Sequence, residues 1–475
     1  MKKAFRLISA ILMIFIVFNV LLTGCGNNAS SMDDKAAASE TAQAAASSPE
    51  KAQNSEPVKL KFTYWASPDE KKIYDAAAKK YADSTNGRVT IDSQCIPSDY
   101  DTKLTAMIAG NNAPDVAMME SATITFPLAE QGKLMNLKQF TDKDSSVNFD
   151  TLVPNITYWS DKDNLIGIAP GPEMFLLYYN KDMFQAAGVE PPPSKYSDAW
   201  TWDEFVEIAK KLTIDQSGKN ATQEGFDPKK IKQYGVNGFT GWWGAWGNFI
   251  YGNGGDFVTK DGKFGLSQPE ATEALQKIAD LVNVYHVHPG PVQLKSMPGS
   301  DQALLTKKVA MVLDGQWSNL SIAMAKVNYG VGVLPKLKEN TTTMVVCGMF
   351  SVFKSTKYPD ESWALIKALI DPESTMELNK GGAWMPSLKS YYTEPELIDK
   401  WATGTARPEG YKDAAIDMML NHSITGPTFY VKNYNKIMDI ANPALDKVWL
   451  GQQSAADAMK AIEEKAQAQV QGRRD

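Results

Sequence analysis

The most unusual feature of this 475-residue sequence is the placement of its tryptophans. Several of the twelve lie in glycine-rich segments or at the apparent ends of strands, outside the periodic apolar patterns that core tryptophans usually occupy. Acidic side chains follow some of the same strands. Planar aromatic surfaces can cover the apolar faces of a small molecule, and carboxylates can accept hydrogen bonds from its polar rim. The residues that we expect to contact a ligand are Trp65, Tyr100, Glu120, Glu173, Trp242, Trp243, Trp246, Asp314, Trp317 and Trp384.

Structural roles compete with ligand binding at several of these positions. Trp242, Trp243 and Trp246 stand close together among glycines, and one or two of them could pack in the core. Glu173 and Asp314 could form ion pairs or cap helices. The sequence therefore leaves open which of these residues face a ligand.

Other kinds of chemistry are weakly represented. His286 and His288 are two residues apart and would share one face of a strand, but His422 is the only other histidine. With no cysteine or carboxylate cluster beside them, we predict no metal site. The sequence has no phosphate-binding loop, dinucleotide fingerprint or nucleophile elbow, so we predict no cofactor and no turnover.

The first 25 residues have the layout of a bacterial export signal. Three cations precede an apolar run over residues 7–22, and the sequence LTGC ends at Cys25. This order is typical of secretory signals, and the LTGC segment resembles the lipobox of bacterial lipoproteins. That resemblance implies removal of residues 1–24 and lipidation of Cys25, the alternative being an ordinary signal peptide with an incidental cysteine. Residues 25–56 contain no aromatic residue, which predicts a flexible tether.

Charge and length restrict the class of protein further. Without the three cations of residues 1–24, 46 Lys and Arg face 55 Asp and Glu, a net charge of −9. This acidic balance disfavours nucleic acid and anionic lipid as partners. The remaining chain is too long for one simple core, so we expect two lobes. Cys95 and Cys347 could form a disulfide in an exported protein or remain two buried thiols.

The elements that must position the candidate residues follow an α/β pattern. Residues 58–65 alternate polar and apolar side chains, which predicts a strand on which Tyr64 and Trp65 face opposite ways, with Trp65 toward the ligand. A helix, a strand, a helix and a strand follow at 67–86, 88–96, 99–109 and 115–119. This order predicts an α/β lobe with a mostly parallel sheet. Tyr100, at the start of a helix, could simply pack.

Later segments continue the same pattern. Thr201 and Ser267 each open a capping-box sequence that predicts a helix start. Further strands are predicted at 165–169, 174–179, 309–313, 331–334 and 344–353, and helices at 363–370 and 442–466.

Taken in order, these segments resemble the bacterial extracellular solute-binding proteins of family 1, the sugar-binding lipoproteins of ABC importers, with a distant similarity to maltose-binding protein. The similarity covers about residues 57–470, and each segment alone is weak. The segments that carry it are YW at 64–65, LTAMIAGNNAPDV at 104–116, GIAPGPEMFLLYYNKDMF at 167–184, TWDEF at 201–205, VAMVLDGQW at 309–317 and GGAWMPS at 381–387.

The resemblance implies a two-lobe α/β fold of the periplasmic-binding-protein type II class, with the ligand in a cleft between the lobes. Lobe one should contain residues 57–168 and 344–388, and lobe two residues 172–341 and 391–475. Three hinge crossings should fall near 167–172, 341–344 and 385–391. Proline and glycine in the first and third suit segments that absorb a hinge rotation.

The same resemblance implies a function. The chain would capture a carbohydrate, an oligosaccharide if three or more aromatic platforms line the cleft, and deliver it to the permease subunits of an ABC transporter. It would act as a monomer at the outer face of the membrane, held by the lipid on Cys25. Two alternatives stay open: a binding protein that feeds a membrane sensor, and a secreted polysaccharide-degrading enzyme. The enzyme would need Glu173 close to Glu120 or Asp314 in one cleft.

Overall fold

The computed structural model describes residues 56–119 and 122–474. The expectations for the signal segment 1–24, for lipidation of Cys25 and for all but the last residue of the tether 25–56 concern residues outside this part. The expectation for Glu120 also lies outside the described residues.

The first of two sheets has six strands in the order β2–β1–β3–β12–β5–β4. They are β1 (Val58–Tyr64), β2 (Val89–Cys95), β3 (Val116–Met119), β4 (Thr157–Asp161), β5 (Asn164–Ile168) and β12 (Met349–Val352). β1 is parallel to β2 and β3, whereas β12, β5 and β4 are antiparallel to their neighbours. The sheet is therefore mixed and not mostly parallel, because β12 enters it from far along the chain.

The second sheet has the order β13–β11–β6–β9–β8–β7, with β10 also paired to β6. Its strands are β6 (Glu173–Asn180), β7 (Ile214–Asp215), β8 (Ile231–Asn237), β9 (Val309–Gly315), β10 (Tyr329–Gly332), β11 (Thr343–Val346) and β13 (Ser423–Thr425). Alternate residues of β6 from Met174 to Tyr179 enter two different hydrophobic clusters. Burial on both faces explains the unbroken apolar run of this strand.

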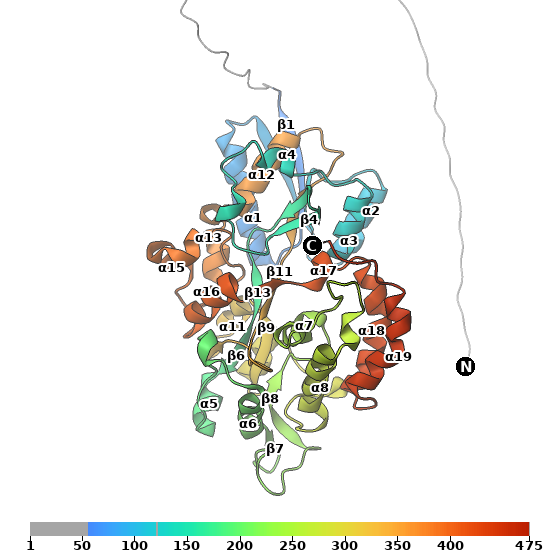
Figure 1. The fold of residues 1–475 in the computed structure, drawn as a ribbon. Helices are drawn as coiled ribbons and strands as arrows, with labels where there is room; N and C mark the ends of the chain where they lie inside the picture. The colour runs from blue at the N-terminus through green and yellow to red at the C-terminus, as the bar shows by residue number, and fades with distance from the viewer. Residues whose placement is uncertain (1–55, 120–121, 475) are drawn as a thin grey trace, which may run out of the picture. The chain divides into compact units, whose positions relative to one another are not determined.

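Helices cover both sheets (Figure 1). We call the first sheet with α1, α3, α12 and α13 the first lobe, and the second sheet with α5–α8, α10, α16, α18 and α19 the second lobe. In chain order the helices are α1 (Pro68–Ser84), α2 (Tyr100–Ala109), α3 (Ala122–Glu130), α4 (Lys138–Thr141), α5 (Lys181–Ala187), α6 (Trp202–Leu212), α7 (Trp243–Gly252), α8 (Pro269–Asn283), α9 (Pro291–Leu294), α10 (Ser300–Leu305), α11 (Ser318–Met324), α12 (Pro359–Ile370), α13 (Pro372–Gly381), α14 (Ser390–Thr393), α15 (Pro395–Trp401), α16 (Tyr411–Asn421), α17 (Pro427–Tyr430), α18 (Tyr434–Trp449) and α19 (Ala455–Gln467).

The chain passes between the sheets at three places. Residues 169–172 link β5 to β6, and residues 347–348 link β11 to β12. The second passage lies a few residues later than expected, because residues 344–353 form two short strands in different sheets instead of one long strand. The third passage follows α13 and leads through α14–α16 to β13.

Two of these passages pack directly on each other. A Cβ atom added to Gly171, in the first passage, would lie 1.9 Å from the carbonyl oxygen of Met385, in the third. The Met385 N–H also donates to the Pro172 carbonyl at 3.4 Å. Only glycine permits this approach of two backbones.

The capping sequences had different outcomes. Thr201 and Glu204 form the predicted capping box at the start of α6. Ser267 does not cap α8: Gln268 occupies the N-cap position, and the Ser267 hydroxyl donates to Glu463 instead. The tail predicted as one helix over 442–466 consists of α18 and α19, separated by a turn at Gly451.

Candidate binding site

A cavity of about 560 Å³ lies between the two sheets and is lined by residues at the ends of strands and in the segments around them. The described residues that line it are Trp65, Ser67, Asp69, Glu70, Met118, Glu173, Trp242, Trp317, Leu320, Ser321, Met324, Val346, Cys347, Gly348, Ala383 and Trp384. The structure thus brings together five of the ten residues expected at a ligand site: Trp65, Glu173, Trp242, Trp317 and Trp384.

Trp65 comes directly after β1 and lines the cavity from the first lobe. Tyr64, one residue earlier, is fully buried and stacks on Phe62. The pleat of the strand separates the two side chains. Tyr100 is not among the residues lining this cavity: it donates a hydrogen bond of 3.0 Å to the Thr63 carbonyl and lines a second cavity, of about 250 Å³, that shares Trp65.

The first turn of α1 carries a carboxylate into the cavity wall. Ser67 and Glu70 form a capping box, in which the Ser67 N–H donates to Glu70 Oε2 at 2.8 Å. The other carboxylate oxygen, Oε1, accepts a hydrogen bond of 3.2 Å from Trp384 Nε1. Glu70 is only 8% exposed. It therefore links α1 to the segment that follows α13.

Arg407 holds the backbone of Trp384, whereas Glu70 holds its indole. The Arg407 Nη2 donates to the Trp384 carbonyl at 3.1 Å, and its Nε donates to the Trp401 carbonyl at 3.1 Å. The guanidinium lies 4.4 Å from the centroid of the Tyr411 ring. Both the backbone and the indole of Trp384 are thus held in place by buried contacts.

Two tryptophans form the wall contributed by the second lobe. Trp242 and Trp317 have ring centroids 5.9 Å apart, and both contact Phe175 on β6. A Cβ atom on Gly315 would lie 2.1 Å from the Trp317 ring, and one on Gly244 would lie 2.5 Å from the Trp242 ring. Glycine at these two positions lets each indole lie flat against the backbone.

Exposed apolar surface gathers at the same cavity. Trp242 is 45% exposed and Met324, at the end of α11, is 63% exposed. Single exposed apolar residues are common on protein surfaces. Two of them lining one concave site, together with convergent polar groups, are typical of a ligand pocket.

The floor of the cavity is the link between β11 and β12. Cys347 lies there with its Sγ 2.6 Å from the Tyr158 hydroxyl, and burial raises the pKa of this thiol to about 12. Cys95 and Cys347 are both free thiols, so the disulfide is not formed. Only Cys347 is fully buried; Cys95 is half-buried on β2.

The charged side chains in the described lining of the cavity are all acidic. Its described lining includes the carboxylates of Asp69, Glu70 and Glu173 and no lysine, arginine or histidine. Asp69 forms an exposed ion pair with Lys72 at 2.8 Å, whereas Glu70 accepts hydrogen bonds from two neutral donors, the Ser67 N–H and Trp384 Nε1. A ligand in this cavity therefore meets hydrogen-bond acceptors in a negative environment.

Two members of the tryptophan cluster, like Tyr100, do not line the cavity. Trp246 is fully buried and stacks on Phe257 with ring centroids 5.1 Å apart. Trp243 packs edge-on against Tyr434 at 5.9 Å. Trp243 keeps a ring contact with Trp242, with centroids 5.3 Å apart. α7 begins at Trp243, so Trp246 lies about one helical turn further along and points into the core.

Asp314 has a structural role at the end of β9. Its carboxylate accepts hydrogen bonds from the hydroxyls of Ser300 and Ser318 and from the Gly315 N–H at 2.7 Å. Burial raises the pKa of Asp314 above its usual value. Because Asp314 does not line the cavity, the carboxylate pair of Glu173 and Asp314 considered for an enzyme is not assembled there.

Sequence reasoning missed several lining residues. Glu70 is not among the residues expected at the site, although the capping-box sequence from Ser67 to Glu70 was a signal that could have placed it beside Trp65. Ser321 and Met324 lie on α11, the helix that begins directly after Trp317. They were missed because the position of this helix depends on tertiary packing.

Neither a metal centre nor a membrane span is present in the part of the chain that the structure describes. No group of three or more potential ligands is assembled among residues 56–119 and 122–474. His288 is buried: its Nε2 accepts from the Phe239 N–H at 3.2 Å, and its Nδ1 donates to the Pro289 carbonyl at 2.7 Å. None of the described helices combines the length and the apolar character needed to cross a bilayer.

Solved structures share this fold. An ABC substrate-binding protein of Listeria monocytogenes, in complex with cycloalternan, is 22% identical, with a TM-score of 0.71 over 87% of this chain and 99% of that one. The sugar-binding protein MalE of Xanthomonas citri is 18% identical, with a TM-score of 0.69 over 86% of this chain and 96% of that one. These similarities confirm the expected two-lobe, type II periplasmic-binding-protein-like fold.

Sequence comparisons identify the family. The sn-glycerol-3-phosphate-binding periplasmic protein UgpB of Rhizobium meliloti (strain 1021) is 26% identical over 320 residues, which are 65% of this chain and 69% of that protein. The model of the bacterial extracellular solute-binding proteins matches residues 76–405. Because this match spans well over half of the sequence, the chain belongs to the bacterial extracellular solute-binding protein family.

Proposed function

We propose that this chain binds an uncharged carbohydrate outside the cell and delivers it to the permease of an ABC transporter. The observation that carries the proposal is the composition of the cavity: four tryptophans, three carboxylates and no cation among its described lining. Family membership supports solute binding, and the cavity supports the class of solute.

The cavity suits the two kinds of surface that a sugar ring presents. A pyranose has apolar C–H patches on its faces and hydroxyl donors around its rim. Trp65 on one side, and Trp242 and Trp317 on the other, offer planar apolar surfaces. Trp384 also lines the cavity, although it is only 5% exposed. Carboxylates accept strong hydrogen bonds from hydroxyl groups. We assign ligand contacts to these four tryptophans and to Glu173, and we add Glu70.

The negative environment argues against a phosphorylated ligand. UgpB is named for binding sn-glycerol 3-phosphate. A phosphate is normally held by arginine, lysine or backbone N–H groups, whereas the described lining of this cavity carries carboxylates instead. Like charges brought together in a desolvated site cost several kcal/mol. We therefore infer that this chain binds a neutral sugar although its relative is named for an anionic one.

The number of aromatic surfaces supports an oligosaccharide. Four indoles from two lobes border one cavity of about 560 Å³. One sugar ring has two faces and can stack on at most two platforms. The similar structure from Listeria monocytogenes is a complex with cycloalternan. We infer a ligand of at least two sugar residues.

Delivery and anchoring complete the proposal. The signal segment 1–24 directs export, and the lipid on Cys25 holds a monomer at the outer face of the membrane. The tether 25–56 then keeps the folded part at high local concentration beside its permease. These statements rest on the sequence of the first 56 residues.

Calorimetry with a ligand panel tests the binding proposal. The panel contains gluco-, manno- and xylo-oligosaccharides, their monosaccharides, sn-glycerol 3-phosphate and amino acids. At least one neutral oligosaccharide should bind more tightly than its monosaccharide, and sn-glycerol 3-phosphate should not bind. Binding of the phosphate or of an amino acid, with no sugar bound, would refute the proposal.

Uptake measurements test delivery to the transporter, and cell fractionation tests the lipid anchor. Cells with the wild-type chain should import the labelled oligosaccharide, and a Cys25→Ser variant should appear in the soluble extracellular or periplasmic fraction. Membrane retention of that variant would remove the lipid anchor from the proposal. Signalling without uptake would favour the sensor alternative.

A further inference from the structure

Residues 472–474 are fixed to the second lobe beside the junction of α17 and α18. Arg473 forms an antiparallel bridge with Val431. The Lys432 N–H donates to the Gly472 carbonyl at 3.0 Å, and the Arg474 N–H donates to the Tyr430 carbonyl at 2.8 Å. The side chains of the two arginines then take different directions.

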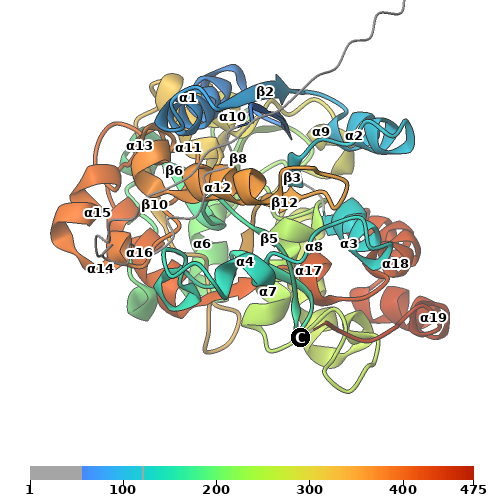
Figure 2. The ribbon, with the colours of Figure 1, turned by 90° about the horizontal axis from the view of Figure 1, so that it is seen from above.

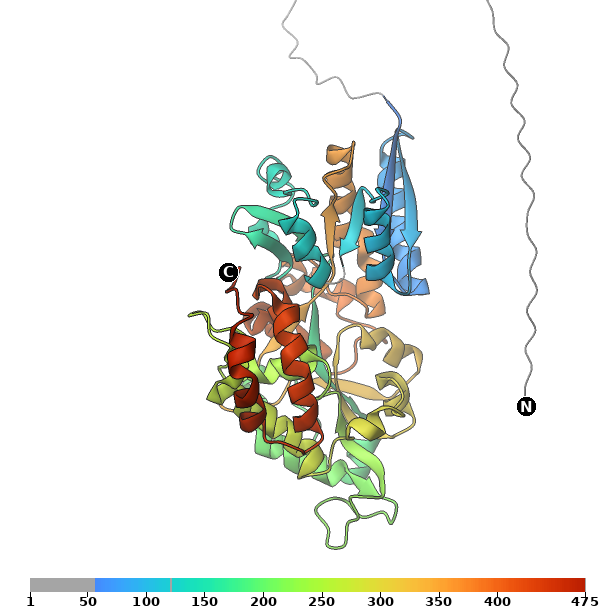
Figure 3. The same cartoon turned by 90° about the vertical axis from the view of Figure 1, so that its right-hand side faces the viewer.

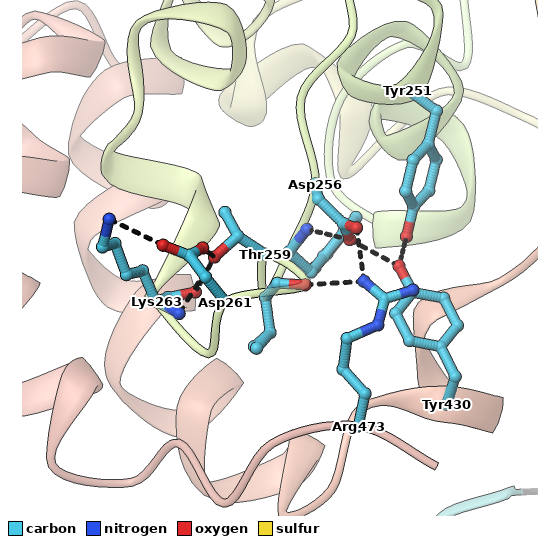
Figure 4. Close-up of polar contacts among 9 residues, drawn as sticks. Tyr251, Asp256, Thr259, Asp261, Lys263, Tyr430 and Arg473 are labelled. Carbon is cyan, nitrogen blue, oxygen red and sulfur yellow. Dashed lines mark hydrogen bonds and ion pairs between the residues drawn. The ribbon is translucent and has the colours of Figure 1, made fainter. Parts of the chain in front are cut away.

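Arg473 contacts the second lobe. Its guanidinium forms an ion pair with Asp256, donates to the Val258 carbonyl at 2.7 Å and lies 4.0 Å from the centroid of the Tyr430 ring. The Tyr430 hydroxyl donates to Asp256 at 2.6 Å and contacts the Tyr251 hydroxyl, as Figure 4 shows. This cluster anchors the segment.

Arg474 reaches the first lobe. Its Nη2 donates to Glu130 Oε1 on α3 at 3.1 Å, and its guanidinium lies 4.0 Å from the centroid of the Phe126 ring on the same helix. The arginine side chain is only 7% exposed, and its Nη1 keeps a 3.1 Å bond to the Val431 carbonyl. Since α3 packs on β3 and β4, Arg474 connects the two lobes.

Other contacts between the lobes accompany it. Tyr158 on β4 and Phe429 on α17 have ring centroids 4.5 Å apart. The Thr425 hydroxyl donates to Asn155 at 2.7 Å. A cavity of about 220 Å³, lined by residues of α3 and of the start of α18, lies beside Arg474. We call the contacts of Arg474 with Phe126 and Glu130 the rear contacts.

The rear contacts and the binding cavity lie on opposite sides of the passages between the sheets. In Figure 3 the blue α1 and the yellow α10–α11 region lie on one side, and the C-terminal end lies on the other. Figure 2 shows the same separation from above. A rotation about the passages that narrows the binding cavity must therefore widen the gap at the rear contacts.

The cavity is open to solvent in this structure, since Trp242 and Met324 are 45% and 63% exposed. We propose that Arg474 is a strap that opposes closure of the lobes. A ligand that closes the cavity must break the rear contacts. The more these contacts stabilise the open state, the lower is the apparent affinity of the protein for the ligand. This inference goes beyond the proposed function, and its structural part does not depend on the identity of the ligand.

The test compares two neighbouring arginines in the full chain carrying Cys25→Ser. Arg474→Ala should tighten binding of the neutral oligosaccharide by about three- to tenfold, because one ion pair and one cation–π contact are lost from the open state only. Arg473→Ala removes the same charge from the contacts with Asp256, Val258 and Tyr430 in the second lobe, and the affinity of this variant should change by less than about twofold. Glu130→Gln should tighten binding in the same direction as Arg474→Ala.

Small-angle X-ray scattering gives a readout without ligand. Ligand-free Arg474→Ala should have a smaller mean radius of gyration than the wild type and Arg473→Ala, because closed molecules become more populated. A folded Arg474→Ala with unchanged or weaker affinity and an unchanged radius would overturn the strap. If no sugar binds any variant, the proposed function fails, while the scattering result still decides the strap.

Discussion

Trp384 Nε1 donates a hydrogen bond of 3.2 Å to Glu70 Oε1 and so joins two residues that are 314 positions apart in the sequence. The second oxygen of Glu70 is held by the Ser67 N–H at 2.8 Å. The indole plane is therefore fixed before a ligand arrives. Pre-organisation of this kind reduces the entropy that is lost on binding.

Replacement of Trp384 by alanine should weaken oligosaccharide binding by about 1–2 kcal/mol, because part of the cavity wall and the hydrogen bond that holds Glu70 are lost. Isothermal titration calorimetry measures the effect. Trp159→Ala is the matched control, since Trp159 packs on Phe149 in the first lobe and does not line the cavity. Equal affinities of Trp384→Ala and wild type would return Trp384 to a purely structural role.

Glu70→Ala should lower both stability and affinity. Loss of the capping box costs about 1 kcal/mol of stability, and the loss of a ligand acceptor and of the Trp384 contact weakens binding. Glu204→Ala removes the equivalent capping box of α6, far from the cavity lining. It should lower the melting temperature similarly and leave affinity unchanged. Parallel losses of affinity in both variants would contradict a direct role for Glu70.

Gly315→Ala should disturb ligand binding through Trp317. The new methyl group would lie 2.1 Å from the present position of the indole ring, so the ring must move off the backbone and change the cavity wall. We expect an affinity loss of at least about tenfold, comparable to that of a truncated hot-spot aromatic. Gly381→Ala is the control, because its nearest atom would be at 4.0 Å. A crystal structure of Gly315→Ala with an unmoved indole would disprove the steric argument.

Stability should fall in mild acid because of His288. Burial lowers the pKa of this imidazole from 6.5 to about 4, so the unfolded chain binds the proton more tightly than the folded chain. The free energy of unfolding is not reduced by this histidine above its unfolded pKa of about 6.5. It falls by at most about 3 kcal/mol as the pH drops from about 6.5 toward 4, because the unfolded chain then takes up the proton. Urea unfolding at several pH values should show a flatter dependence for His288→Gln. Identical slopes for the two proteins would argue against this assignment.

Local sequence patterns predicted much of the first lobe. Alternation over residues 58–65 placed Trp65 and Tyr64 on opposite faces, and the structure has this arrangement because a strand has a period of two. In the second lobe, the capping box at Thr201 formed as predicted. At Ser267 the same pattern failed, because the hydroxyl bonds to Glu463 on a distant helix.

The tryptophan cluster shows where local patterns stop being informative. The sequence marked Trp242, Trp243 and Trp246 as candidates but could not separate them. The start of α7 separates them: Trp242 lines the cavity, whereas Trp246 turns into the core against Phe257. A helix boundary that shifts by one residue would redirect all three side chains by 100° or so.

The sequence by itself determined the family, the α/β class and most residues that could stack on a sugar, because those properties reside in composition, periodicity and the order of motifs. Only the tertiary structure decided which of those residues meet. The contact of Trp384 with Glu70 and the reach of Arg474 to α3 each join segments more than 300 residues apart. Such contacts depend on how the lobes pack through long-range burial, which no local pattern encodes.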